Sequence, residues 1–63
     1  MRSLRRLREQ RQLSQIALAR LSGIRPETIS RIENGHHVPS IHTLQALARA
    51  LQLTPDELMR LVN

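Results

Sequence analysis

The stretch that decides the fold runs from Ser14 to Gly35 and reads SQIALARLSGIRPETISRIENG. Ser14 is a suitable N-cap for a helix, because its hydroxyl can accept a hydrogen bond from a backbone N–H in the first turn. Gly23 can adopt the left-handed conformation that ends a helix, and Pro26 suits the first turn of the next helix. Residues 14–35 therefore predict two short helices joined by a glycine turn, which is a helix-turn-helix unit.

Apolar side chains in this unit recur at helical spacing. Ala17, Leu18 and Leu21 supply one apolar face of the first helix. Ile29 and Ile32 point inward from the second helix, so its opposite face is the candidate for reading DNA bases. Both helices are therefore expected to pack one side on a hydrophobic core.

The flanking sequence predicts three further helices and no strand. The first of these runs from about Arg2 to Gln12 and turns Leu4 and Leu7 inward. A loop over residues 35–40, marked by glycine, proline and polar residues, follows the helix-turn-helix unit.

Two helices follow the loop, each with its own cap. Ser40 caps the first, in which apolar residues repeat at helical intervals: Ile41, Leu44, Leu47, Ala48 and Leu51. The second opens at Thr54, with Glu57 three residues after the cap, which is the pattern of a capping box. Its inward residues are Leu58, Leu61 and Val62, and Met59 is also expected to lie mainly in the core. Five short helices with short connections predict a compact all-α domain that spans residues 1–63.

Composition restricts the kind of core and the kinds of site. The chain has 63 residues, no cysteine and no aromatic residue, so the core must be aliphatic and free of disulfides. The three histidines, His36, His37 and His42, are not expected to bind a metal, because two are adjacent and no carboxylate or cysteine accompanies them. No apolar run is long enough to span a membrane and no signal peptide is visible, so we expect a cytoplasmic protein without a cofactor.

Charge is the most informative property of the composition. The net charge is +5, every basic residue is arginine, and residues 1–31 carry eight arginines against two glutamates. Residues 32–63 carry two arginines against three acidic residues. A basic half suits a polyanion, either nucleic acid or an anionic membrane surface. The membrane interpretation is disfavoured, because the apolar helix faces are needed for the core.

The chain resembles the lambda repressor and Cro-type helix-turn-helix family, also called the xenobiotic-response-element family, over nearly its whole length. The residues that carry the resemblance are Leu7-Arg8, Leu13-Ser14-Gln15, Leu18-Ala19, Gly23-Ile24, Thr28 to Gly35, Pro39-Ser40, Leu44, Leu47-Ala48, Leu51 and Asp56-Glu57-Leu58. The resemblance implies a five-helix DNA-binding domain that usually acts as a dimer on a near-palindromic operator.

Four positions depart from the family pattern. Ile16 and Ala17 stand where the family mostly has glutamate or another polar residue, so Ser14 lacks a capping-box partner and Ile16 is a candidate exposed apolar residue. Arg25 replaces a serine or threonine cap, which leaves the second helix of the unit less well capped but more basic. Gln52 replaces the usual glycine after the helix that Ser40 caps, which puts the clean ending of that helix in question.

The expected base-reading residues lie on the outward face of the second helix of the unit: Pro26, Glu27, Ser30 and Arg31. Arg31 can donate two hydrogen bonds to guanine O6 and N7, or clamp a phosphate. Glu27 can accept a hydrogen bond from cytosine N4, and Pro26 can contact a thymine methyl group. Because Glu27 and Arg31 are four residues apart, they can instead pair with each other.

Seven residues are candidates for contact with DNA phosphates: Arg11, Gln15, Arg25, Thr28, Asn34, His36 and His37. Gln15 lies at a helix N-terminus, which favours anions, and the resemblance places its side chain on a phosphate. The resemblance also places the loop of His36 and His37 near the sugar-phosphate backbone, where protonated histidine would bind better than neutral histidine. The alternatives are a solvated Gln15, a plain helix cap at Asn34 and a structural Thr28.

Arg8 and Glu33 have a different expected role. The resemblance implies a partly buried salt bridge between them that ties the first helix of the chain to the second helix of the unit. The alternative is that both side chains are exposed to solvent.

These features together predict a sequence-specific, double-stranded DNA-binding transcriptional regulator, most simply a bacterial or phage repressor or autoregulator associated with the nucleoid. It would bind a palindromic operator as a homodimer, and part of the C-terminal apolar surface, with Val38 and Pro39, is a candidate twofold interface. We expect no catalysis, because no nucleophile, base and orienting group occur together. The alternative is a protein-interaction module, such as an antitoxin that binds a toxin, which Ile16 and the C-terminal surface would serve.

Overall fold

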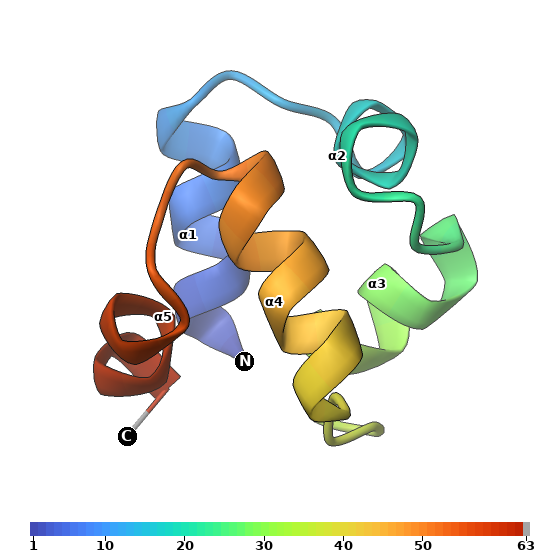
Figure 1. Cartoon of the computed structure of the whole chain (residues 1–63). Helices are drawn as coiled ribbons and strands as arrows, with labels where there is room; N and C mark the ends of the chain where they lie inside the picture. The colour runs from blue at the N-terminus through green and yellow to red at the C-terminus, as the bar shows by residue number, and fades with distance from the viewer. Residues whose placement is uncertain (63) are drawn as a thin grey trace.

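The computed structural model describes the backbone of residues 1–62 and the side chains of residues 1–60. This part of the chain forms five helices and no strand, which confirms the all-α prediction (Figure 1). The helices are α1 (Arg2–Gln10), α2 (Gln15–Ser22), α3 (Pro26–Glu33), α4 (Ile41–Ala50) and α5 (Pro55–Val62). None of the helices in the described residues is long and apolar enough to cross a membrane.

Side-chain caps begin three of the helices at the predicted residues. The hydroxyl of Ser14 accepts a hydrogen bond from the Ala17 N–H at 3.0 Å, and that of Ser40 accepts one from the Thr43 N–H at 3.2 Å. At the start of α5, the Glu57 N–H donates to the Thr54 hydroxyl at 3.1 Å, and the Thr54 N–H donates to the Glu57 carboxylate at 3.3 Å. The predicted capping box at α5 is therefore present.

Residues in the left-handed conformation follow the ends of α1 and α2. Gly23, with φ 76°, ends α2, and its N–H donates to the Ala19 carbonyl at 2.8 Å. The predicted end of α1 at Gln12 is wrong by two residues, because Gln12 itself adopts a left-handed φ of 57°. The next N–H, of Leu13, then reaches back to the Arg8 carbonyl at 3.0 Å, which closes the helix end.

The same closure ends α4 without a glycine. Gln52 has a φ of 59°, and the Leu53 N–H donates to the Ala48 carbonyl at 2.7 Å. The helix thus ends cleanly although Gln52 occupies a backbone conformation that glycine adopts more easily.

The core is aliphatic and receives buried side chains from every helix: Leu4, Leu18, Ala19, Ile29, Ile32, Leu44, Leu47, Ala48, Leu51 and Leu58. Helix α4 packs against α2 and α5, while α1 packs against α3 and α5. Helices α2 and α3 also pack on each other and lie on the side of the molecule away from α5 (Figure 1). This arrangement leaves one face of α3 on the outside.

Three residues predicted to point inward are exposed. Leu21 is 61% exposed, because at about 100° per residue it lies well away from the face that Leu18 and Ala19 turn to the core. Ile41 is 58% exposed, since it is the first residue of α4 and precedes the first buried side chain of that helix by one turn. Met59 is also exposed, next to the buried Leu58. The predictions for the side chains of Leu61 and Val62 lie outside the described residues.

Candidate nucleic-acid interface

Helix α3 presents its predicted reading residues on the side opposite the core. Ile29 and Ile32 are fully buried, while Glu27 and Arg31 are exposed and Pro26 and Ser30 are half-buried. Pro26 is the first residue of the helix, where its missing N–H removes no helical hydrogen bond. Arg25 precedes it as an N-cap without a side-chain hydrogen bond, as the sequence suggested.

The charged groups on this face do not neutralise each other. Among the described side chains, the ion pairs are Arg5–Glu9 and Arg8–Glu33, so the alternative pairing of Glu27 with Arg31 is not formed. The carboxylate and the guanidinium are therefore both available to an external partner.

The end of α3 is closed by its own backbone. Asn34 is the C-cap, Gly35 has a left-handed φ of 77°, and the His36 N–H donates to the Arg31 carbonyl at 2.8 Å. The Asn34 amide donates to the Ser30 hydroxyl at 3.4 Å. Capping is thus one role of Asn34, and the residues that follow it, His36 and His37, are exposed.

Gln15 is the first residue of α2, and its side chain is partly committed to a contact that the sequence did not predict. Its amide nitrogen Nε2 donates to the Glu33 carboxylate oxygen Oε1 at 3.0 Å. The backbone N–H groups of Gln15 and Ile16 lie in the first turn and have no acceptor within the helix. The N-terminus of α2 therefore keeps donors for an anion while one side-chain N–H is used internally.

Arg8 and Glu33 form the ion pair that the resemblance implied. Arg8 Nε lies 2.8 Å from Glu33 Oε2 and Nη2 lies 3.1 Å from Oε1, a two-pronged contact between α1 and α3. The side chains are 11% and 2% exposed. Arg8 Nη1 also donates to the Leu13 carbonyl at 2.8 Å, so one guanidinium ties α1 to α3 and to the segment before α2.

The electrostatics of this pair stabilise both charges. Burial acts to raise the pKa of Glu33, but the hydrogen bonds from Arg8 and Gln15 and the charge of Arg8 outweigh it, so the pKa lies below its ordinary value of 4.5. The hydrogen bond with Glu33 raises the pKa of Arg8, against a smaller opposing effect of burial. Both groups are ionised at neutral pH.

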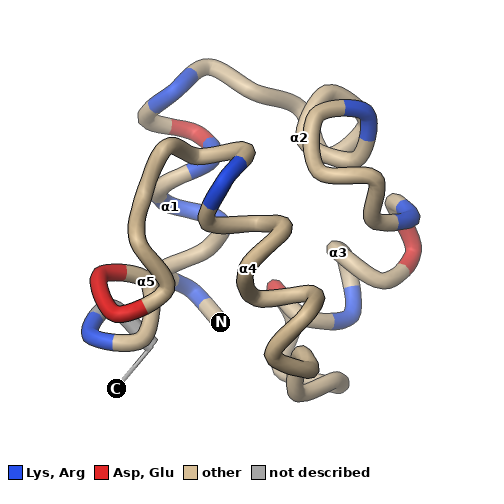
Figure 2. The backbone as a smooth tube through the Cα atoms, in the orientation of Figure 1, with Lys and Arg blue, Asp and Glu red and all other residues tan. Residues whose placement is uncertain are grey.

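The remaining phosphate candidates flank this network. Arg11 is exposed at the C-terminal end of α1, Arg25 is exposed just before α3, and Thr28 is half-buried on α3. Arginines occur along α1, α2 and α3, while the first turn of α5 contains Asp56 and Glu57 (Figure 2).

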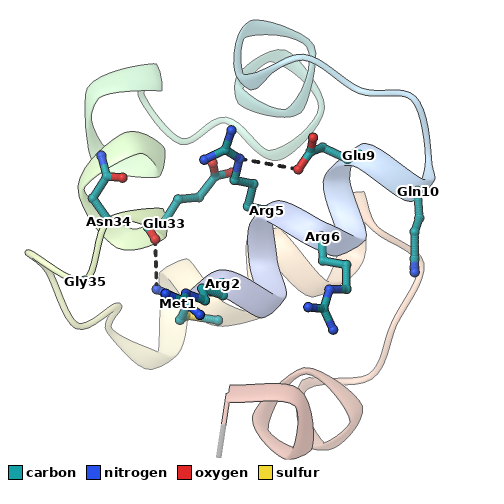
Figure 3. A pocket seen from close by; sticks show the side chains of 9 residues that line it. All are labelled: Met1, Arg2, Arg5, Arg6, Glu9, Gln10, Glu33, Asn34 and Gly35. Carbon is teal, nitrogen blue, oxygen red and sulfur yellow. Dashed lines mark hydrogen bonds and ion pairs between the residues drawn. The ribbon is translucent and has the colours of Figure 1, made fainter.

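An open hollow lies between α1 and the end of α3, lined in part by Arg2, Arg6 and Asn34 (Figure 3). The N-terminal amine donates to the backbone carbonyls of Ile32 and Glu33 at 2.6 and 3.2 Å, a positive charge at the C-terminal end of α3 that the sequence did not predict. No group of three or more histidine or acidic side chains in the described part of the chain could hold a metal ion.

Comparison with known proteins gives two matches. A family model described as helix-turn-helix matches residues 4–58. The HTH-type transcriptional repressor RghR of Bacillus subtilis (strain 168) is 47% identical over 57 residues, which cover 89% of this chain and 42% of that repressor. The chain thus spans less than half the length of this relative. No solved structure matches significantly.

Proposed function

The chain belongs to the lambda repressor and Cro-type helix-turn-helix family of DNA-binding transcriptional regulators, and from this premise we propose that α3 reads a specific double-stranded sequence in the major groove. The observation that carries the proposal is the outward face of α3, where Glu27 and Arg31 are exposed and unpaired while Ile29 and Ile32 anchor the helix. A rigidly anchored helix with unpaired polar groups can hold a fixed register against base edges.

Each residue of this face has a chemical role in the proposal. Arg31 donates to guanine O6 and N7, and Glu27 accepts from cytosine N4. Pro26 contacts a thymine methyl group at the start of the helix, and Ser30 donates to a base or to the backbone. The exposed state of Glu27 and Arg31 supports these roles because neither must first break an internal ion pair.

Phosphate contacts on both sides of the groove would fix the orientation of α3. Gln15, with the first-turn N–H groups of α2, serves one strand, and the loop of Asn34, His36 and His37 after α3 serves the other. Arg11, Arg25 and Thr28 are further contacts with the backbone. These interactions carry no sequence information but hold the reading helix in position.

We further propose that two copies bind a palindromic operator as a repressor or autoregulator in the cytoplasm of a bacterium or phage-infected cell, associated with the nucleoid and without catalysis or cofactor. The word repressor in the name of the Bacillus relative supports this regulatory role. Val38, which is 88% exposed between α3 and α4, and Met59 on α5 are apolar groups that a twofold contact could cover.

A protein partner, such as a toxin bound by an antitoxin, is the second candidate. A shallow depression at the α2–α3 turn is lined by apolar and basic residues, among them Ile16, Ala19, Ile24, Arg20 and Arg25. The exposed Ile16 in this depression is the observation that favours a protein ligand.

Selection of bound sequences from a random duplex library distinguishes the two candidates. The expected result is a palindromic consensus with half-site centres about 34 Å apart, as two copies of one reading helix require. Failure of the folded protein to enrich any sequence would contradict the proposed function and favour the protein partner.

A further inference from the structure

Glu33 is the one charged side chain that is buried among the residues whose side chains are described. Its two carboxylate oxygens accept two hydrogen bonds from Arg8 and one from Gln15. The two-pronged contact with Arg8 already neutralises the charge and satisfies one N–H on each of two guanidinium nitrogens. The third bond, from Gln15, further stabilises the buried carboxylate, and it also holds the Gln15 side chain in one place.

Gln15 is the residue that this third bond holds in place. A glutamine at the first position of a helix has several rotatable bonds, and an exposed one would sample many rotamers. Here Nε2 donates to Glu33 Oε1 at 3.0 Å, which fixes the amide beside the N-terminus of α2. The second N–H of that amide and the backbone N–H groups of Gln15 and Ile16 are gathered at the same helix end.

We propose that Glu33 is a positioning residue for the DNA backbone, because it holds the Gln15 amide so that these N–H groups are presented together to one phosphate. The inference rests on the proposed binding of DNA. The loss of rotamer freedom of Gln15 then occurs on folding instead of on binding, which favours binding. Glu33 is also the last residue of α3, so the phosphate contact at α2 is tied directly to the reading helix.

Arg8 makes this arrangement compatible with a nearby phosphate. An uncompensated carboxylate behind a phosphate site would repel the anion. The guanidinium of Arg8 lies within 2.8 Å of Glu33 and offsets its charge, so the carboxylate orients Gln15 without a net negative field. Arg8 and Glu33 thus act through Gln15 and need not touch DNA themselves.

The test is a set of affinity measurements on the selected operator, with single phosphates replaced by neutral methylphosphonates. Four variants are compared with the wild type: Gln15→Ala, Glu33→Gln, the double variant and the control Glu9→Gln. Gln15→Ala should weaken binding about tenfold and should abolish the sensitivity to replacement of one particular phosphate. Glu33→Gln should remove the sensitivity to the same phosphate, and the double variant should bind no more weakly than Gln15→Ala.

The control separates positioning from net charge. Glu9→Gln raises the net charge by the same amount as Glu33→Gln, but Glu9 pairs with Arg5 on the surface of α1 (Figure 3). The affinity of the Glu9→Gln variant for the operator should be equal to that of the wild type or slightly higher. The inference would be overturned if Glu33→Gln weakened operator binding equally in the wild type and in the Gln15→Ala variant. It would also be overturned if Glu33→Gln left the sensitivity to the phosphate unchanged. Neither result would contradict DNA binding by α3. If the wild type selects no DNA sequence, the proposed function fails first.

Two further measurements cover the case in which Glu33→Gln does not fold. The paired variant Arg8→Met with Glu33→Leu replaces the ion pair by apolar groups, which buried pairs often tolerate, and it should lose the same phosphate sensitivity. In the free wild-type protein, NMR relaxation should find the Gln15 side-chain amide much more rigid than that of the exposed Gln45. Equal mobility of the two amides would refute positioning by Glu33 without any variant.

Discussion

Arg31 is the residue of α3 on which base recognition depends most directly. Its side chain is exposed, and no described carboxylate pairs with it. Truncation to alanine removes no core contact, because the inward face of the helix is formed by Ile29 and Ile32. Stability and DNA affinity can therefore be separated at this position.

Arg31→Ala should lower the affinity for the selected operator by about 1–3 kcal/mol and relax the base preference at one position of each half-site. The thermal unfolding midpoint should not change. Arg49→Ala is the matched control, since Arg49 is an exposed arginine on α4 and its loss changes the net charge equally. Equal losses in the two variants would contradict a base contact by Arg31.

The Arg8–Glu33 ion pair predicts a loss of stability in acid. Because the folded pKa of Glu33 is lowered from 4.5, the pair contributes its full stability above that value and loses it as the pH falls through the folded pKa. Glu33→Gln should destabilise the protein by about 2–3 kcal/mol near neutrality, because it leaves the Arg8 charge poorly paired. Urea unfolding at a series of pH values should show that the free energies of unfolding of wild type and variant converge as the pH falls from neutral to acid. A difference that stays constant with pH would contradict the assignment.

At the scale of the helices, the helix starts and ends that could be predicted from the sequence are those that depend on residues close together in the chain. Ser14, Ser40 and Thr54 cap three helices, and Gly23 ends α2, because these signals act within about four residues. The exposure of Leu21 was not predictable in this way, since it depends on which face of α2 meets α4.

In the candidate site too, some features could be predicted from the sequence and others depend on how the helices pack. The outward face of α3 followed from the spacing of Ile29 and Ile32, and the family resemblance supplied the pairing of Arg8 with Glu33. The hydrogen bond from Gln15 to Glu33 joins residues 18 apart in the chain, and no pattern in the sequence indicates it. The fold brings the two together only once α2 packs on α3.

The left-handed Gln52 gives a prediction about helix ends. Glycine adopts this backbone conformation without steric cost, so Gln52→Gly should stabilise the protein by about 0.5–1 kcal/mol, measured by thermal or urea unfolding. Gln45→Gly is the control in the exposed middle of α4, where glycine should instead destabilise by about 1 kcal/mol. Destabilisation by both substitutions would show that the backbone at Gln52 is not strained.

At the scale of the whole molecule, the arginine-rich half predicts a steep dependence of DNA binding on salt. Eight arginines lie in residues 1–31, and contacts with about six to ten phosphates in a dimeric complex would weaken binding by about 10³–10⁵ between 50 and 200 mM salt. The measurement is the slope of log affinity against log salt concentration. A flat plot would contradict the phosphate contacts, and Gln15→Ala should leave the slope unchanged because glutamine releases no counterion.

The uneven distribution of charge also has a consequence for the rate at which the protein finds DNA. Residues 1–31, which form α1, α2 and most of α3, carry an excess of positive charge, while residues 32–63 carry a slight negative excess (Figure 2). The field of a DNA duplex therefore attracts the helices that carry the positive excess more strongly than the rest of the molecule during diffusional approach. Molecules would arrive already rotated with the arginine-rich half toward the duplex, so a larger share of collisions would begin in a productive orientation.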